Sequence, residues 1–304
     1  MDILADLPMT DMAIEQVAKA ENTVLGIDIG GTHITAALVD MGKRAIIDGT
    51  HFRGHLDSKG TLENILSAWV QVIKQAAGGE LLPKQQIGIA MPGPFDYENG
   101  ISLMIGNAKY EALYGKNIKT LLAASLGIDE GNIRFINDAA AFLKGEWFAG
   151  AAVGYQHAIG ITLGTGLGST TLHHHDVVDA DLWCTPFKES IAEDYISSRW
   201  FVKYYHSLTG LQVKGAKQIA DIYPEDENAK LVFNEFADNL ASFLAFFIEQ
   251  SNPEIVVIGG NIMNGEKLFL PQLKQNLKQV GIELPIVRAK LSEDAAIIGA
   301  AALF

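Results

Sequence analysis

Three glycine-containing turns follow apolar runs of the sequence and contain the residue types that bind phosphate. They are Gly30-Gly31-Thr32, Gly164-Thr165-Gly166 and Gly259-Gly260. Glycine has no side chain, so backbone N–H groups in such turns can approach anionic oxygens and donate to them. Each turn taken alone is better explained as an ordinary tight turn. Phosphate binding is therefore a hypothesis that depends on the residues around the turns.

Asp28 distinguishes the first of these turns. It lies within VLGIDIG (residues 24–30), which is otherwise apolar, and burying a carboxylate without a partner is unfavourable. Asp28 is therefore either a hydrogen-bonded structural residue or a ligand, often through water, for phosphate-bound Mg²⁺. The glycines that follow at once favour the ligand.

Asn137 and Asp138 stand between a predicted strand, residues 133–136, and a predicted helix, residues 139–148. Both residue types are favoured at the start of a helix, so helix capping explains them as well as catalysis does. Phosphoryl transfer to a hydroxyl needs a carboxylate that takes the proton, at a strand end that substrate can reach. Asp138 could act in this way while Asn137 donates to a sugar hydroxyl.

Two common nucleotide-binding motifs can be tested directly. No G-x-x-x-x-G-K-[ST] string is present, which excludes a P-loop. The run GTGLGS (164–169) leads into residues typical of a strand, whereas a dinucleotide-binding turn opens a helix. A nicotinamide-dependent dehydrogenase is therefore a weak alternative.

Strands and helices alternate along the chain, which predicts an α/β protein. The predicted strands cover residues 24–30, 34–40, 45–47, 86–91, 133–136, 157–163, 168–172, 254–260 and 286–287. The predicted helices cover residues 11–20, 62–77, 139–148, 189–205, 214–223, 228–250 and 295–303. The unit strand–glycine turn–strand occurs twice, which suggests two related halves.

Composition limits the class of protein. A chain of 304 residues with 48% hydrophobic and 19% charged residues is long enough for about two globular domains and excludes disorder. A single cysteine, Cys184, excludes an intramolecular disulfide and a thiolate zinc cage. The net charge of −13 disfavours nucleic-acid binding. The longest apolar stretch, residues 240–248, is too short to span a membrane. We expect a cytoplasmic protein.

Five motifs occur in the order found in the ROK family of sugar kinases, which the sequence resembles from about residue 23 to residue 304. They are DIGGT (28–32), PGP (92–94), NDA (137–139), LGTGLGS (163–169) and VIGG (257–260). The resemblance implies the actin-like ATPase (ribonuclease H-like) fold, in which two lobes close over nucleotide and sugar. It places residues 1–22 in an N-terminal extension, residues 23–147 plus 292–304 in a small lobe and residues 148–291 in a large lobe.

The resemblance also implies site residues and cofactors. The first phosphate motif contains Gly30, Gly31 and Thr32, together with Asp28 as the ligand of Mg²⁺. The second phosphate motif is Gly164, Thr165 and Gly166. The adenosine motif is Gly259 with Gly260. Asp138 takes the place of the general base, and Asn137 and Asn107 those of sugar-binding residues. The implied reaction transfers the terminal phosphoryl group of ATP to a hexose hydroxyl, the 6-OH of glucose or a related hexose. The family suggests a homodimer.

The sequence departs from the family after residue 172. The family motif E-x-G-H and its cysteine-rich zinc motif are absent, so no structural zinc is expected. The nearest similarity is to zinc-less polyphosphate glucokinases, with Asp181-Leu182-Trp183-Cys184 in place of their E-L-G-H and Glu193 at their later glutamate. Asp181 is either a sugar ligand or a solvated loop carboxylate, and Glu193 either a sugar ligand or an acid of a first helical turn. Because Cys184 replaces the histidine, the inference of glucose specificity is weakened.

Two alternative functions follow from these departures. Polyphosphate could replace ATP as the donor, or the protein could be a non-catalytic sugar-binding regulator on the same fold. Asp28 and Asp138 are both present, which favours an enzyme. The run His173-His174-His175 is expected to form a polar hairpin, since consecutive strand residues point to opposite faces and do not converge on one metal ion.

Overall fold

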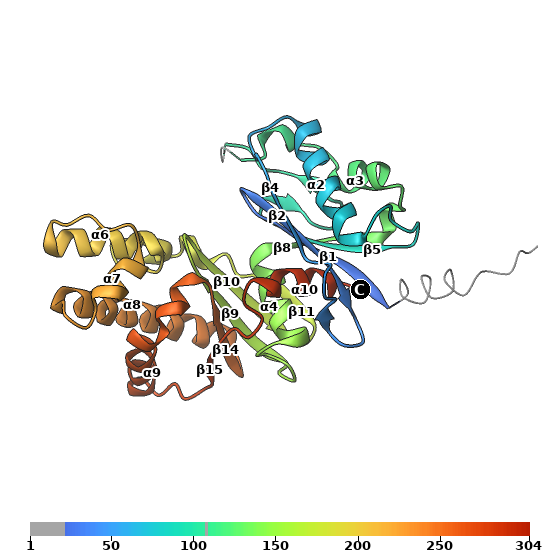
Figure 1. Cartoon of the computed structure of the whole chain (residues 1–304). Helices are drawn as coiled ribbons and strands as arrows, with labels where there is room; N and C mark the ends of the chain where they lie inside the picture. Colours follow the sequence, from blue (N-terminus) through green and yellow to red (C-terminus); the bar gives the residue numbers. More distant parts are fainter. Residues whose placement is uncertain (1–21, 107–108) are drawn as a thin grey trace, which may run out of the picture. The chain divides into compact units, whose positions relative to one another are not determined.

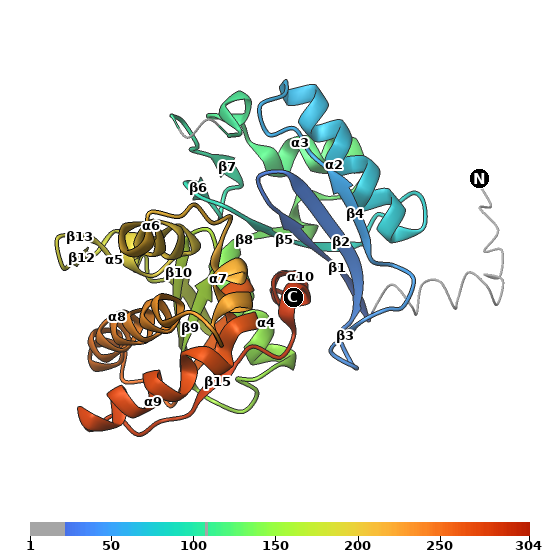
Figure 2. The ribbon, with the colours of Figure 1, turned by 60° about the vertical axis from the view of Figure 1, so that its left-hand side comes forward.

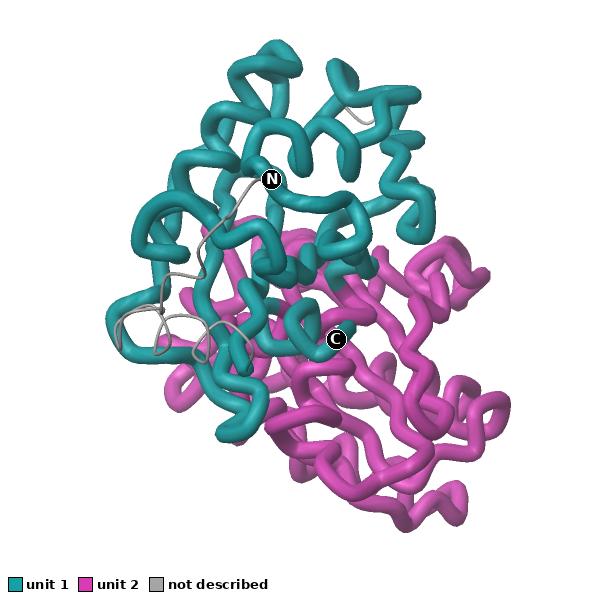
Figure 3. Tube along the Cα trace, turned by 90° about the vertical axis from the view of Figure 1, so that its right-hand side faces the viewer, with its two compact units in different colours: residues 1–138, 297–304 teal, residues 139–296 magenta. Residues whose placement is uncertain are grey.

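The computed structural model describes residues 22–106 and 109–304 (Figures 1 and 2). The chain folds into two compact units, shown in separate colours in Figure 3. Unit 1 contains the described residues up to Asp138 together with Ile297–Phe304, and unit 2 contains Ala139–Ala296. Each unit is built around its own mixed β-sheet.

The sheet of unit 1 has the strand order β3-β2-β1-β5-β8, and β4 also pairs with β2. Its strands are β1 (Thr23–Ile29), β2 (His33–Asp40), β3 (Ala45–Ile46), β4 (Phe52–His55), β5 (Gln86–Met91) and β8 (Ile133–Asn137). Strands β1 and β2 form an antiparallel hairpin, whereas β1, β5 and β8 are parallel to one another. Two short pairs of residues, β6 (Phe95–Asp96) and β7 (Ile101–Ser102), form a separate hairpin.

Helices cover both faces of the unit 1 sheet. Alternate residues such as Leu25 and Ile27 point into a core shared with α2 (Leu62–Ala77) and α3 (Ile118–Leu126). The opposite face carries Gly26 and Gly88, against which α10 (Ala295–Ala301) packs so closely that a Cβ on either glycine would overlap carbonyl oxygens of the helix. The two glycines therefore let the helix backbone approach the sheet.

The sheet of unit 2 has the order β11-β10-β9-β14-β15. Its strands are β9 (His157–Leu163), β10 (Leu167–His173), β11 (Asp176–Asp179), β14 (Ile255–Gly259) and β15 (Ile286–Arg288). Strands β9 and β10 form an antiparallel hairpin, and β9, β14 and β15 are parallel. The two sheets therefore share one order and one pattern of strand directions, which is what the repeated strand–turn–strand unit suggests.

Helices also cover both faces of the unit 2 sheet. One face, with Ile159, Ile161 and Val256, shares a core with five helices. These are α5 (Ala192–Tyr195), α6 (Ser198–Thr209), α7 (Ala216–Ile222), α8 (Glu227–Ser251) and α9 (Leu270–Gln279). The opposite face packs against α4 (Asp138–Ala149) through Phe142 and Leu143. Figures 1 and 2 show α8 beside α9.

Helix α8 has the length and composition of a membrane span, with 25 residues. Its most apolar window is 61% buried inside the protein, and Phe236, Leu240 and Leu244 belong to the core of unit 2. The carboxylate of Asp226 caps the helix by accepting a hydrogen bond of 2.7 Å from the Asn228 N–H. These are the properties of a core helix.

Most predicted strands and helices are confirmed within a few residues, but the predicted helix over residues 189–205 is wrong. The segment first forms a small hairpin, β12 (Pro186–Phe187) with β13 (Ser190–Ile191), and then the separate helices α5 and α6. The helix breaks because the N–H of Ser198 donates to the carbonyl of Gly164, at 2.8 Å, and not to the preceding turn of its own helix. Strand β4, strand β11 and helices α3 and α9 were not predicted. The predicted helix over residues 11–20 lies outside the described residues.

Candidate active site

The first glycine turn joins β1 to β2. Residues Gly30-Gly31-Thr32 link the two strands, and the N–H of Gly30 donates to the carbonyl of His33 at 2.9 Å. Asp28 is half-buried and pairs in register with Thr35 of β2 and Ala90 of β5. The carboxylate thus lies two residues before the glycines, on a central strand of the sheet.

Asn137 and Asp138 lie at the same edge of the unit 1 sheet as the first glycine turn. Strands β1, β5 and β8 are parallel, and Ala90 aligns with both Asp28 and Ile136. Neighbouring strands are about 4.8 Å apart, so β8 lies roughly 10 Å from β1. The sheet therefore brings Asp28, the glycine turn and the Asn137-Asp138 pair together at the carboxyl ends of parallel strands, where open α/β sheets bind ligands.

The amide of Asn137 is positioned by Tyr97, a residue that sequence analysis missed. Asn137 Nδ2 donates to the Tyr97 hydroxyl at 3.3 Å, and that hydroxyl donates to the carbonyl of Met91 at 3.1 Å. Asp138 is the first residue of α4, where the positive end of the helix dipole favours a carboxylate. Tyr97 follows the PGP segment closely, which is the one sequence signal that could have drawn attention to it.

Lys109 and Tyr110 contact the first glycine turn and were also missed. Tyr110 is fully buried and its hydroxyl donates to the carbonyl of Gly30. Burial, with the negative charge of Asp28, raises the pKa of Tyr110 above its ordinary value, so the hydroxyl stays a donor. Asn107, the predicted sugar ligand just before these residues, lies outside the described part of the chain.

The second glycine turn joins β9 to β10 in unit 2. In Gly164-Thr165-Gly166 the N–H of Gly164 donates to the carbonyl of Gly166 at 3.1 Å. Glu193 reaches this turn from α5: its carboxylate accepts a hydrogen bond of 3.0 Å from the Leu167 N–H and forms an ion pair with Arg199. Glu193 thus lies at the glycine turn, and its predicted contact with a sugar stays a prediction.

The third glycine pair lies at the same edge of the unit 2 sheet. Gly259 ends β14, which is parallel to β9, and Gly259 aligns with Thr162 just before the second turn. Gly260 has φ 92° and lies against the backbone of Leu163, where a Cβ would overlap the carbonyl group. Only glycine fits this position without a shift of the backbone.

Asp181 and Trp183 lie beside the start of β10. The N–H of Leu182 donates to Ser169 Oγ at 2.9 Å, which fixes the loop at the end of the sheet that carries the second turn. Trp183 Nε1 donates to Asp181 Oδ1 at 2.6 Å, although 43% of the tryptophan is exposed. The indole therefore orients the carboxylate at the position predicted to bind sugar. Cys184 is exposed in the same loop.

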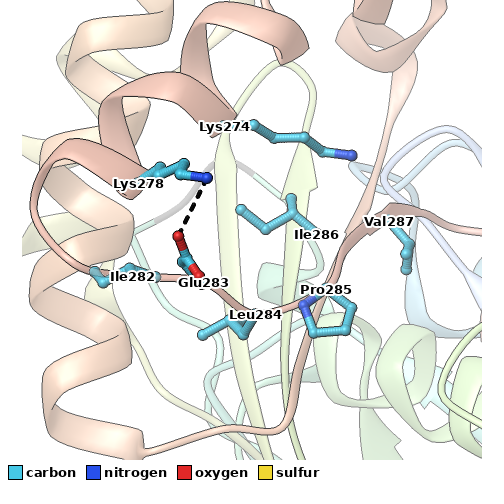
Figure 4. Close-up of a pocket in the computed structure, with 8 residues that line it drawn as sticks. All are labelled: Lys274, Lys278, Ile282, Glu283, Leu284, Pro285, Ile286 and Val287. Carbon is cyan, nitrogen blue, oxygen red and sulfur yellow. Dashed lines mark ion pairs between the residues drawn. The ribbon is translucent and has the colours of Figure 1, made fainter.

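Two further features lie away from these motifs. A surface cavity of about 500 Å³, drawn in Figure 4, lies between α9 and the start of β15. It includes Ile286, which aligns with Val256 near the start of β14, so the cavity is at the opposite edge of the sheet from Gly259.

His174 and His175 form the turn of the β10–β11 hairpin, as predicted. Among the residues that the structure describes, no group of three or more His, Cys, Asp or Glu side chains could hold a metal ion.

The comparison with protein families decides the relationship. The sequence model of the ROK family matches residues 24–304. The chain belongs to the ROK family. The family predicted from the five motifs is therefore confirmed.

Two relatives of this ROK protein are named as sugar kinases. It is 29% identical to a glucokinase of Thermotoga maritima, over 92% of this chain and 96% of the relative. It is 26% identical to an N-acetyl-D-glucosamine kinase of Histophilus somni, over 92% of this chain and 98% of the relative.

Solved structures show the same fold. The ROK glucokinase of Streptomyces griseus, in complex with glucose and AMPPNP, has a TM-score of 0.71 at 23% identity and covers 92% of this chain and 98% of its own. A polyphosphate/ATP-glucomannokinase of Arthrobacter has a TM-score of 0.65 at 25% identity, over 92% of this chain and 96% of its own. The predicted fold class, the actin-like ATPase fold of ROK sugar kinases, is confirmed.

Proposed function

We propose that the protein is a sugar kinase that transfers the terminal phosphoryl group of ATP to a hydroxyl of a hexose, the 6-OH of glucose or a related hexose. Its relatives named glucokinase and N-acetyl-D-glucosamine kinase support this class of phosphotransferase. The observation that carries the proposal is the position of Asn137 at the end of β8 and of Asp138 directly after it, at the sheet edge where β1 enters the glycine turn.

Asp138 is the general base of the proposed reaction. Its carboxylate takes the proton of the sugar hydroxyl while the hydroxyl oxygen bonds to the terminal phosphorus. The bond from that phosphorus to the bridging oxygen breaks, and its electron pair leaves with ADP. Asn137, Asn107, Asp181 and Glu193 are the proposed sugar ligands, so that the hydroxyl is held in line for attack.

The glycine turns are the proposed phosphate sites, with N–H groups donating to the phosphates at Gly30-Gly31-Thr32 and Gly164-Thr165-Gly166. Gly259-Gly260 is the proposed adenosine site. Asp28 fits a Mg²⁺ site because it is an oxygen ligand beside the first turn, and its negative charge acts on Tyr110 there. Mg²⁺ held by Asp28, directly or through water, would neutralise phosphate charge during transfer.

One comparison favours a second phosphoryl donor, polyphosphate. The polyphosphate/ATP-glucomannokinase of Arthrobacter has this fold at 25% identity, and this chain lacks the family's zinc motif. The net charge of −13 opposes binding of a long polyanion. ATP is therefore the proposed donor, and polyphosphate the alternative.

The test is phosphoryl transfer to a panel of glucose, mannose, fructose, N-acetylated hexosamines and β-glucosides. ATP and polyphosphate are supplied separately, with Mg²⁺ present. We expect sugar-dependent formation of ADP with at least one hexose. Sugar or nucleotide binding without turnover would instead support a non-catalytic regulator.

We also propose a cytoplasmic homodimer that binds no nucleic acid, on the family resemblance and the acidic surface. Light scattering after size-exclusion chromatography would measure the mass of the assembly. A mass of 32.9 kDa, that of one chain, would exclude the dimer.

A further inference from the structure

We propose that Lys109 is a further catalytic residue, whose ammonium group binds the phosphoryl group in transfer at the Gly30-Gly31-Thr32 turn. This inference rests on the proposed kinase function, and it concerns a residue outside the glycine and aspartate motifs. Its evidence is the contact between the lysine and the turn, the anchoring of the lysine by its neighbour, and its charge.

The side chain of Lys109 runs along Gly31. A Cβ added to Gly31 would lie 2.8 Å from Lys109 Nζ, 3.1 Å from Cε and 3.3 Å from Cδ. The outer part of the lysine therefore occupies the space that the missing side chain of Gly31 leaves, and its ammonium group ends at the turn. The positive charge lies where N–H groups of the turn would also meet a phosphate.

Tyr110 fixes the lysine backbone at this place. Its hydroxyl donates to the carbonyl of Gly30, and its N–H donates to the carbonyl of Ser58 at 2.7 Å. Its ring packs against Trp69, with ring centroids 5.9 Å apart. Tyr110 is fully buried, so the residue next to Lys109 is held from three directions. The lysine thus reaches the turn from a backbone that is already ordered, which lowers the entropy lost on binding an anion.

The charge of Lys109 is available for a ligand. Within residues 22–106 and 109–304, Lys109 forms no ion pair, whereas Lys74 pairs with Glu80 at 2.7 Å. An unpaired cation at a glycine turn in a chain of net charge −13 attracts an anion. Lysine binds phosphate as a point charge, and charge that develops on a transferring phosphoryl group is stabilised most by such fixed cations.

The competing explanation is that the lysine stem only covers Gly31 while the ammonium group is solvated. The two explanations differ in their dependence on charge. Lys109→Met keeps most of the stem and removes the charge, and Lys109→Arg keeps the charge. Lys43→Met is the matched control, since Lys43 lies past the far end of β2 and its side chain is 83% exposed.

Two measurements test the proposal: kcat with saturating hexose and ATP, and calorimetric affinity for ATP and for ADP. We expect Lys109→Met to lower kcat by about 10²-fold and ATP affinity by roughly tenfold, with ADP affinity unchanged. Lys109→Arg should recover much of the loss, and Lys43→Met should match the wild type. Melting temperatures of all variants should agree, so that loss of folding is not mistaken for loss of charge.

The outcomes separate this inference from the proposed function. Wild-type turnover together with near-normal kcat and ATP affinity in Lys109→Met overturns the role of Lys109 and leaves the kinase intact. No wild-type turnover with any hexose, but ATP affinity that depends on the Lys109 charge, overturns the kinase and supports the phosphate contact. A wild type that neither turns over nor binds ATP overturns both.

Discussion

The two glycine turns have the same place in two sheets of the same strand order, yet opposite charges lie beside them. The turn of unit 1, between β1 and β2, is contacted by the cation Lys109 and by buried Tyr110. The turn of unit 2, between β9 and β10, is contacted by the carboxylate of Glu193, which is itself paired with Arg199. The backbone is thus repeated, and the side chains around it are not.

This difference indicates that the side chains beside the two turns have different roles. A cation beside the first turn adds attraction for phosphate charge, whereas the Glu193 carboxylate takes up the N–H of Leu167 and holds the second turn in shape. The proposed base, Asp138, also lies beside the sheet of unit 1 only. Asn137 ends β8 and Asp138 follows it, whereas β15 ends with Arg288 and Ala289 follows it.

The largest effect is expected from removal of the proposed base. Asp138→Asn should lower kcat by roughly 10²–10⁴-fold, since general-base catalysis contributes about that factor, while folding and ATP binding are kept. Lys290→Ala changes an exposed side chain two residues after the end of β15 in unit 2 and should have little effect on kcat. Steady-state kinetics of both variants make the comparison. Near-normal turnover of Asp138→Asn would remove Asp138 from the mechanism.

The next effect, on stability, compares two equivalent glycines of the two sheets. Gly26 of β1 and Gly160 of β9 are equivalent, but Gly26 lies against the backbone carbonyl of Ile297, and Gly160 against side-chain atoms, with Thr170 Oγ1 2.6 Å from an added Cβ. A side chain can move and a helix carbonyl cannot. Gly26→Ala should therefore lower the free energy of unfolding by about 3 kcal/mol, and Gly160→Ala by about 1 kcal/mol. Denaturant titration measures both, and equal losses would contradict this account.

A smaller effect is expected within the second turn. A Cβ on Gly166 would lie 2.5 Å from Glu193 Oε2, whereas a Cβ on Gly164 would have no atom within 4 Å. Gly166→Ala should displace the carboxylate from the Leu167 N–H and destabilise the protein by about 1–2 kcal/mol. Gly164→Ala should leave the melting temperature of the ligand-free protein unchanged. If both variants melt alike, Glu193 does not hold the turn.

The smallest effect is on the pH dependence of stability. It concerns the hydrogen bonds between the first strand of each sheet and the residue before the next parallel strand. In unit 1 the neutral amide of Gln85 donates to the carbonyl of Thr23 at 3.3 Å. In unit 2 Glu254 accepts from the N–H groups of His157 and Gln156, at 2.9 and 2.7 Å, and these bonds lower its pKa. Such a carboxylate stabilises the fold above its unfolded pKa, and the stabilisation is lost as pH falls through the lower folded pKa.

Acid should therefore weaken the Glu254 hydrogen bonds of unit 2 but not the Gln85 hydrogen bond of unit 1. The ordinary pKa of a glutamate is about 4.3. Below this pH the stability of the wild type should fall, and the stability of Glu254→Gln should depend less on pH. The exposed Glu249→Gln on α8 is the control. Melting temperatures between neutral pH and acid measure the effect, and parallel curves for wild type and Glu254→Gln would exclude this role.

Local sequence patterns predicted much of the fold. The strand over residues 157–163 and the strand over residues 86–91 are confirmed, because each is an apolar run ended by glycine or proline. The helix from Leu62 ends at Gly78 as predicted, since Gly78 adopts φ 80°. The order of five motifs predicted the family. These features depend on neighbouring residues and on backbone geometry, which the sequence displays directly.

Contacts between distant residues could not be predicted in this way. Tyr110 meets Gly30, and Glu146 accepts hydrogen bonds from Lys290 and Leu291 while fully buried. Nothing in the periodicity around these residues names a partner, because the partners come together only when the chain packs. The break before Ser198 has the same cause, a hydrogen bond to Gly164.

The path of the chain through the two units has a consequence for its synthesis. Residues 139–296 interrupt unit 1, whose sheet is covered on one face by α10. A ribosome therefore completes all of unit 2 before it makes the segment that covers Gly26 and Gly88. Unit 2 is continuous in the chain and can fold as soon as it emerges, whereas the sheet of unit 1 waits with one face open. Translation thus sets an order of assembly in which the half that begins first is finished last.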